Sequence, residues 1–420
     1  MQVLWSNQLD QIGNIMKFVI ECGHLFDATS DAMQTNKSIV VSHGVIEKII
    51  DTSEVERDGA LAGHTVLDAS KKWVMPGLIN VHDHMIFRDL VGNPLKTMAA
   101  KPAQLARNAV QNNLVALRRG WTTVRDMGAS HNLAFDFRDM IGSGDLPGPR
   151  VVACGSPICI TGGHANAVCI QADGIANVRK VARSQLHAGA DFIKVMASHD
   201  PIRIDGREKT RPEMELDEIK AAYDQAHAHG KKTACHVMGT VAIERVLDAG
   251  VDVISHGFYL NHDLAQRMVE QNVYYDPTLS SYGRQTLDPK LKRGADWIRI
   301  HEDLLPGMEE AFAAAVKAGV KIVTGTDSAG QYSEDVAMMR ERGLSAAHSL
   351  LACTRHAAES LSIEDQVGTI EPGKVADIVV LDADPMTDAY ALDKVSHVIQ
   401  AGKAYRPDEI NLLSSAPIGR

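Results

Sequence analysis

Long apolar runs are absent from this 420-residue sequence. None approaches the ~20 residues that a helix needs to cross a bilayer, so no membrane span is expected. The sequence also has no excess of positive charge, and its net charge of −10 argues against nucleic-acid or anionic-membrane partners. The first fifteen residues lack a basic stretch followed by an apolar one, which argues against a signal peptide. We interpret residues 1–16 as an N-terminal extension.

Paired cysteines are absent as well. The sequence has six cysteines, but no two of them are spaced as C-x-x-C. Scattered cysteines in a chain of this length are typical of buried, reduced thiols, which favours a cytoplasmic protein. The six are Cys22, Cys154, Cys159, Cys169, Cys235 and Cys353.

The sequence is long enough for more than one domain. Its 45% apolar and 23% charged residues are typical of a soluble globular protein, and 420 residues exceed what one compact core usually organises. Residues 17–73 and 365–410 both contain short β-type runs separated by turn residues. We expect these two ends to join into one small β-sandwich, with residues 74–364 inserted between them as the catalytic domain.

Strand and helix patterns alternate through the inserted region. Helical spacing is clear in one interval, at Ile219, Ala222, Tyr223 and Ala226. Eight strands alternating with helices predict an α/β fold, a (β/α)₈ TIM barrel. The predicted strands are Val74–Val81, Thr122–Asp126, Arg150–Cys154, Phe192–Met196, Lys232–His236, Val251–His256, Val273–Tyr275 and Val320–Asp327.

Two histidines stand at the end of the first strand. One residue separates His82 from His84, so a strand projects both side chains to the same face. Two neutral imidazoles can hold one metal ion, although a His-x-His pair alone is more often structural. His236 and His256 end the fifth and sixth strands, and Asp327 ends the eighth. Because strand ends meet at one rim of a barrel, their coincidence predicts a metal site there.

Lys194 is a charged residue inside an apolar strand. Burial lowers the pKa of a lysine, and a neutral amine can add carbon dioxide to form a carbamate with two oxygen ligands. The hypothesis is therefore that Lys194 carries a carbon dioxide adduct that bridges two metal ions. The alternative is a lysine that reaches solvent or pairs with Asp200.

Taken together, these motifs resemble the amidohydrolase superfamily, over about residues 17–406. The subtype has a carboxylated lysine and a binuclear metal centre, and the imidazolonepropionase-like amidohydrolases, including Xaa-Pro and Xaa-Arg dipeptidases, are similar to this chain. The matching segments are Val74–His84, Lys194, His236, Ser255–Gly257 and Thr326–Asp327.

The resemblance implies a role for each residue of the site. The ligands of two divalent ions, expected to be Zn²⁺, would be His82, His84, Lys194, His236, His256 and Asp327. Asp327 would also transfer protons as a catalytic base. The loop Thr161–His164 is similar to one whose histidine faces the substrate, so His164 is expected to contact the substrate and assist catalysis.

The residues that differ from those similar amidohydrolases lie where substrate contacts are expected. Ser198-His199-Asp200 stands where relatives often have Gly-Gly, and His199 is a candidate substrate contact. Met214 lies near the position of an expected tyrosine. Four cations also follow the fourth strand, at Arg203, Arg207, Lys209 and Arg211. Either these cations belong to a solvated charged loop, or one of them, Arg211, binds a carboxylate of the substrate through two parallel hydrogen bonds.

The predicted function is metal-dependent hydrolysis of an amide C–N bond in a small molecule, a dipeptide or N-acyl amino acid with a free carboxylate. Gly239, three residues after His236, argues against deamination, because superfamily deaminases commonly carry a glutamate there. Cyclic amides, carbamates and lactones stay open as substrates, and a non-catalytic scaffold is a further alternative. We also expect a homo-oligomer.

Overall fold

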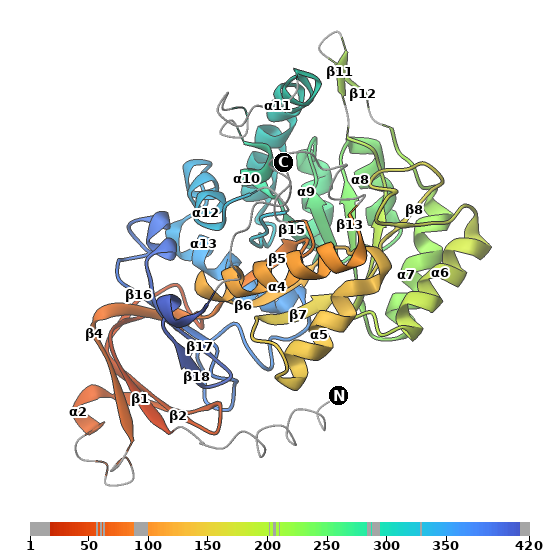
Figure 1. Cartoon of the computed structure of the whole chain (residues 1–420). Helices are drawn as coiled ribbons and strands as arrows, with labels where there is room; N and C mark the ends of the chain where they lie inside the picture. The colour runs from red at the N-terminus through yellow and green to blue at the C-terminus, as the bar shows by residue number, and fades with distance from the viewer. Residues whose placement is uncertain are drawn as a thin grey trace.

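The structure, a computed structural model, describes residues 17–55, 58, 61, 64–87, 100–200, 202–204, 207–209, 211–283, 287, 295–327 and 330–411 (Figure 1). The predicted extension at residues 1–16 lies outside this range. Within the described part, no helix is both long and apolar enough to cross a membrane.

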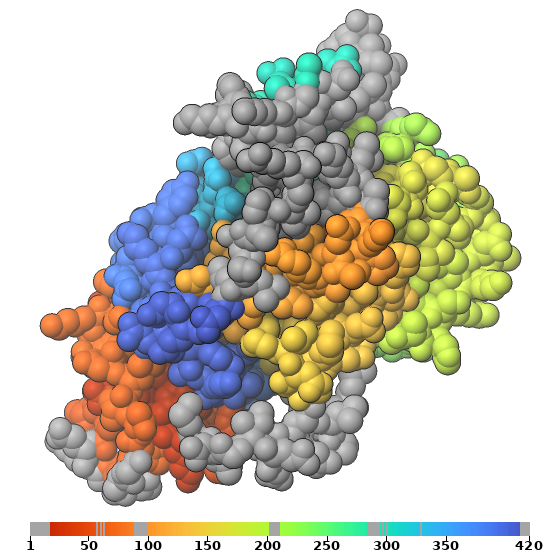
Figure 2. All heavy atoms as spheres, viewed as in Figure 1, coloured from red at the N-terminus to blue at the C-terminus, as the bar shows by residue number. Residues whose placement is uncertain are grey.

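Both ends of the chain contribute to one seven-stranded sheet. Its order is β18-β17-β16-β4-β1-β2-β3, and the C-terminal strand β16 pairs antiparallel with the N-terminal strand β4. Ile20, Val74 and Ile378 share one apolar cluster, so the two ends also share a core. On the surface, the N-terminal segments in red and orange lie beside the C-terminal segments in blue (Figure 2). The second layer of a sandwich stays a prediction. The strands are β1 (Phe18–Leu25), β2 (Gln34–Ser42), β3 (Val45–Asp51), β4 (Thr65–Pro76), β16 (Ile378–Leu381), β17 (Val395–Gln400) and β18 (Lys403–Tyr405).

The inserted region contains two larger parallel sheets. One has the order β5-β6-β7, and the other has the order β15-β14-β13-β10-β8-β9. Parallel pairing sends the carboxyl ends of neighbouring strands to the same edge. The strands are β5 (Leu78–Asp83), β6 (Trp121–Asp126), β7 (Arg150–Ala153), β8 (Ile158–Cys159), β9 (Ile170–Gln171), β10 (Phe192–Met196), β13 (Lys232–Val237), β14 (Val253–His256) and β15 (Tyr274–Asp276).

Helices alternate with these strands and flank the sheets (Figure 1). The predicted apolar face of residues 219–226 is buried on α7, which begins with a capping box between Glu215 and Glu218. The main helices are α4 (Pro102–Arg118), α5 (Leu133–Ser143), α6 (Ile175–His187), α7 (Leu216–Ala228), α8 (Thr240–Asp248), α9 (His262–Glu270), α11 (Ala295–Ala318), α12 (Tyr332–Glu341), α13 (Ala346–Ala352) and α14 (Arg355–Ser360). Short helices are α2 (Thr52–Val55) and α10 (Leu279–Tyr282).

The first predicted strand, Val74–Val81, is wrong in its extent. Val74 to Pro76 end β4 and pair with β16, whereas β5 begins at Leu78. Gly77 forms the corner: its N–H donates to Asp377 O at 2.8 Å, and a Cβ there would overlap the Thr122 side chain. The apolar run therefore contributes residues to two different sheets. Its apolar pattern alone does not indicate this division.

The eighth predicted strand, Val320–Asp327, is also wrong as a regular strand. In this described stretch only an isolated bridge joins Ile322 to Tyr275. Gly325 lies so close to Asp276 that a Cβ would overlap the carboxylate, which leaves no space for a larger residue. Backbone hydrogen bonds still join the segment to both neighbours: Val323 N donates to Tyr275 O at 2.9 Å, and Val81 N donates to Thr324 O at 3.0 Å.

Candidate metal centre

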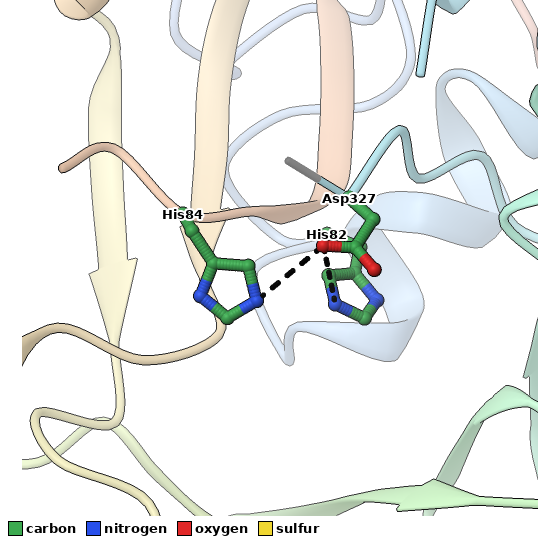
Figure 3. Close-up of side chains that lie close together, drawn as sticks. All are labelled: His82, His84 and Asp327. Carbon is green, nitrogen blue, oxygen red and sulfur yellow. Dashed lines mark ion pairs between the residues drawn. The ribbon is translucent and has the colours of Figure 1, made fainter. Parts of the chain in front are cut away.

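His82, His84 and Asp327 converge at the carboxyl end of β5 (Figure 3). The Oδ1 atom of Asp327 lies 3.9 Å from His82 Nε2 and 3.6 Å from His84 Nε2. Two ligands of one tetrahedral ion, each at ~2.0–2.1 Å from it, stand ~3.4 Å apart. The Asp327 oxygen is thus too distant to hydrogen-bond to either ring, but both distances are close to the separation of two ligands of one metal ion.

The other ring nitrogens of these histidines are already engaged. His82 Nδ1 donates to Asp276 Oδ2 at 2.7 Å, and His84 Nδ1 donates to Gly128 O at 2.9 Å. Ser255 Oγ donates to the same Asp276 oxygen at 2.9 Å. Such partners fix the tautomer and point the free nitrogen inward. His82 Nε2 is buried without a hydrogen-bond partner among the described residues, as a metal ligand would be in the absence of its ion.

A second group lies at the ends of β10, β13 and β14. The rings of His236 and His256 cross at 63° with centroids 4.7 Å apart, and His256 Nδ1 lies 2.7 Å from Thr278 Oγ1. Asp200 Oδ1 lies 3.4 Å from His236 Nε2. His164 stacks on His236 at 3.8 Å between centroids, with its Nδ1 3.9 Å from the same Asp200 oxygen.

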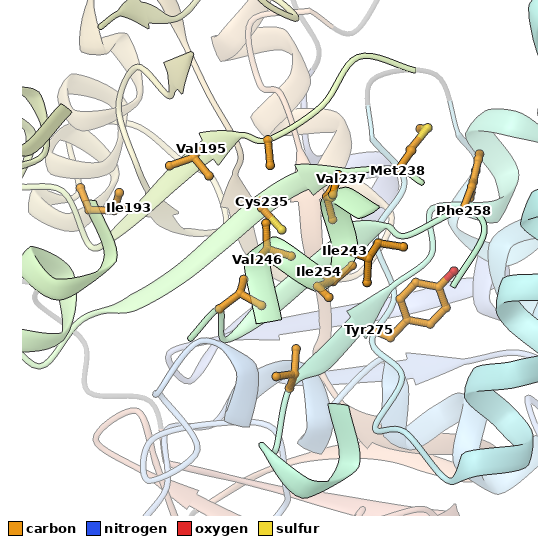
Figure 4. Packing of buried hydrophobic residues seen from close by; sticks show 14 of the residues in the cluster. Ile193, Val195, Cys235, Val237, Met238, Ile243, Val246, Ile254, Phe258 and Tyr275 are labelled. Carbon is orange, nitrogen blue, oxygen red and sulfur yellow. The ribbon is translucent and has the colours of Figure 1, made fainter. Parts of the chain in front are cut away.

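Alternation along the strands decides which side chains face this site. Ile193 and Val195 of β10, and Cys235 and Val237 of β13, belong to the apolar cluster packed beneath the helices (Figure 4). The residues between them therefore project to the opposite face of the sheet. These residues include Lys194 and His236.

Lys194 is 2% exposed, and no described residue accepts a hydrogen bond from its ammonium group. It forms no ion pair with Asp200, so the alternative pairing is not observed. Burial lowers the pKa of Lys194, and nearby acidic groups only partly offset this effect. A buried amine of lowered pKa is the form that can react with carbon dioxide.

Burial also keeps the histidines neutral. It lowers the pKa of His82, His84 and His256, and it lowers the pKa of His164 to about 3. Neutral imidazole is the form that binds metal ions. Burial would raise the pKa of Asp200, but His164 and His236 more than offset it, so the carboxylate stays ionised.

The rim of the site carries the remaining predicted residues. Glu213 Oε2 accepts the backbone N–H of His164 at 2.8 Å, and Glu213 Oε1 lies 2.8 Å from His199 Nε2. The carbonyl of Arg211 accepts the N–H of His199 at 3.1 Å, and the Arg211 side chain is exposed. The three other loop cations belong to β11 (Ile202–Ile204) and β12 (Arg207–Lys209), a hairpin whose side chains lie outside the description.

Known proteins are similar to this chain over most of its length. The model described as the Amidohydrolase family matches residues 73–405. The chain belongs to the amidohydrolase family. Ochratoxinase from Aspergillus niger is 26% identical over 378 residues, covering 79% of this chain and 75% of that protein.

Solved structures also resemble this amidohydrolase. A Xaa-Pro dipeptidase with bound methionine gives a TM-score of 0.82 at 29% identity, covering 93% of this chain and 100% of that chain. A prolidase complexed with N-methylphosphonate-L-proline gives a TM-score of 0.82 at 25% identity, with the same coverage of both chains. The family resemblance inferred from the strand-end motifs is therefore confirmed.

Three features of this amidohydrolase were missed in the sequence. Asp276 ends the seventh strand, so the strand-end rule that selected Asp327 could also have found it. Glu213 does not end a predicted strand, and its contact with His164 comes from a loop distant in the sequence, so no sequence pattern indicated its role. Tyr282 packs its ring against His256 and His301, at centroid distances of 5.4 and 5.3 Å, on a short helix that no pattern predicts. Met214, expected near a substrate contact, is fully buried in the core.

Proposed function

We propose that this amidohydrolase is a metal-dependent enzyme that cleaves an amide C–N bond of a dipeptide or N-acyl amino acid with a free carboxylate. The observation that supports this proposal is that two groups of possible ligands lie at the ends of the parallel strands: His82, His84 and Asp327, and His164, Asp200 and His236. The ring of His256 lies beside that of His236 in the second group. Similarity to ochratoxinase and to a Xaa-Pro dipeptidase supports amide substrates. A cytoplasmic location and a homo-oligomeric state are part of the proposal.

The proposed architecture is a closed (β/α)₈ barrel over residues 74–364, joined to the composite β domain of residues 17–73 and 365–410. Hydrogen bonds between sheets support closure. Asp191 N donates to Ala153 O at 2.8 Å beside β7 and β10, and the segment before Asp327 contacts both β15 and β5. Closure would place all the strand ends on one rim.

Two divalent ions, Zn²⁺ being the proposed metal, fit the donors present. His82, His84 and Asp327 would hold the inner ion, and His236 and His256 would hold the outer one. A carbamate on Lys194 would bridge them. Bound there, the ions would lower the pKa of water and polarise the scissile carbonyl.

The chain's own groups would then move protons and orient the substrate. The Asp327 carboxylate would accept a proton from the attacking water and return it to the departing amine. The His164 ring, neutral at pH 7, would donate a hydrogen bond to the carbonyl oxygen as negative charge develops there. Glu213 would act as a positioning residue through the backbone of His164.

A substrate panel tests this proposal. Dipeptides and N-acyl amino acids would be assayed beside cyclic amides, carbamates and lactones, with the metal content of the same preparation measured. Hydrolysis of the free acids, lost on chelation and restored by Zn²⁺, is the expected result. Turnover confined to lactones or carbamates would assign one of the alternatives, and a metal-free protein inactive on every substrate would support a non-catalytic scaffold.

Arg211 provides a sharper test of the substrate carboxylate. Arg211→Ala should lower kcat/KM for the free acid ~10–100-fold, on ~1.5–3 kcal/mol for a charged hydrogen bond. The C-terminally amidated analogue serves as the matched control and should lose little. Equal losses of kcat/KM on both substrates, or no loss on either, would show that Arg211 is a solvated loop residue that does not bind the substrate carboxylate.

A further inference from the structure

We propose that Asp200 is a direct ligand of the outer metal ion, together with His236 and His256. Ser198-His199-Asp200 stands where the similar amidohydrolases often have Gly-Gly, so the family resemblance supplies no carboxylate ligand there. The inference rests on the proposed function, because it concerns the same metal centre.

The first argument is the spacing of two unpartnered atoms. Asp200 Oδ1 and His236 Nε2 are both buried, and neither has a hydrogen-bond partner among the described residues. They lie 3.4 Å apart, close to the ~3.4 Å that separates two ligands of a tetrahedral ion. A buried carboxylate oxygen without a partner is costly, and an ion between the two atoms would satisfy both.

The second argument selects the histidines. The rings of His236 and His256 cross at 63°, as those of His82 and His84 cross at 61° in the inner group. Crossed rings allow in-plane lone pairs to converge on one ion. The rings of His164 and His236 are instead stacked at 13°, so one ion cannot lie in both ring planes. His164 is therefore left for the substrate.

The third argument concerns accessibility and charge. The Asp200 side chain is 30% exposed and follows β10 by four residues, so it reaches the site from its open side. The inner group already contains the carboxylate of Asp327. With Asp200, each ion would have one aspartate and two histidines of its own, whatever bridges them. Such a donor set would hold the outer ion more firmly than two histidines and the lysine adduct alone.

Metal binding of the purified full chain tests the assignment. Zn²⁺ would be titrated against a chromophoric chelator for wild type, Asp200→Asn and Asp200→Ala. Both variants should keep one tightly bound ion, which also reports that they are folded, and should bind the second at least ~100-fold more weakly. That loss exceeds the 10–100-fold typical of a residue that only hydrogen-bonds to a ligand. A smaller loss of affinity would overturn the proposal.

Two further variants serve as controls. Asp224→Asn removes an exposed carboxylate on α7 that pairs with Lys220, and it should bind two ions as wild type does. His164→Ala should also keep both ions, because His164 is excluded as a ligand; loss of the second ion in this variant would overturn the choice of histidines. A wild-type chain that binds no Zn²⁺ would contradict the proposed function itself, whereas two ions retained in both Asp200 variants would contradict only this inference.

Discussion

At the scale of single residues, the site contains side-chain atoms that are buried without a hydrogen-bond partner among the described residues. His82 has one nitrogen bonded to Asp276 and the other unpartnered, and Lys194 is buried without any acceptor in the described part of the chain. Each costs folding free energy in the absence of a ligand. Such arrangements persist where function requires them.

Lys194→Ala should therefore remove activity and lower metal content, because the variant lacks the anionic bridge proposed to join the two metal ions. Acetate or propionate added to the variant should restore part of both by occupying the vacated space. Metal analysis and a hydrolysis assay are the measurements. Lys220→Ala, which removes an exposed lysine on α7, is the control and should behave as wild type. Two bound ions and full activity in Lys194→Ala would contradict the bridging role.

At the scale of elements, corners and caps decide where strands and helices begin. The apolar run from Val74 to Val81 is continuous in the sequence, yet Gly77 divides it between two sheets. The contacts that impose the corner come from Thr122 and Asp377, far away in the chain. Local patterns therefore predicted that strands exist here and could not predict where one ends.

Gly77→Ala should destabilise the fold by about 1–3 kcal/mol, because its Cβ would overlap Thr122 in a packed interior. Gly142→Ala is the matched control: it lies within α5 with nothing within 4 Å of the new Cβ, so it should be neutral or stabilising by up to about 1 kcal/mol. Denaturant unfolding of both variants gives the comparison. Equal effects at the two positions would contradict the steric argument.

Asp335, in the first turn of α12, links that helix to α10. Its Oδ1 accepts Ser280 N at 2.8 Å, and burial raises the pKa of Asp335 to about 8 from 3.8. Between these values the unfolded chain releases the proton and the folded chain keeps it, so this group destabilises the folded state increasingly as pH rises from 4 to 8.

Asp335→Asn removes that titration. The melting temperature of the variant, relative to wild type, should therefore be higher at pH 9 than at pH 5, measured on metal-free protein. Asp224→Asn, at an exposed site, should show no such trend. A relative melting temperature that does not change with pH would show that Asp335 titrates normally.

At the scale of the whole molecule, the two-ended sheet and the parallel sheets are held as one unit. Arg150 of β7 donates to Asp377 Oδ2 at 2.7 Å, and their side chains are 11% and 2% exposed. The joining of the two ends was predicted from their similar strand patterns. The pairing of β16 with β4 was not, because register depends on contacts between segments that no local pattern relates.

Arg150→Ala should destabilise the protein by about 3–5 kcal/mol, because it leaves the buried Asp377 carboxylate unpaired. The double variant with Asp377→Asn should recover part of that loss. Lys220→Ala, which breaks an exposed pair with Asp224, should cost at most about 1 kcal/mol. Denaturation followed by tryptophan fluorescence gives these values; additive losses in the double variant would mean that the pair contributes no coupling.

The site, like the fold, was predictable where local patterns suffice and not where contacts between distant segments decide. Its ligand candidates stand at strand ends, so a strand pattern and a family resemblance sufficed to name them. Asp276 and Glu213, which hold His82 and His164, could be assigned only when distant segments were brought together. In the sequence, Asp200 was only a difference from the similar amidohydrolases. Its distance to His236 in the structure is the observation from which we propose it as a metal ligand.

The pairing of β4 with β16 has a consequence for synthesis on the ribosome. About 300 residues separate the two strands, so β4 cannot pair with β16 until that intervening length has been translated. Until then an apolar strand has one edge unpaired, and such edges invite association with other nascent chains. We therefore expect premature termination before Ile378 to yield aggregates rather than a smaller active enzyme.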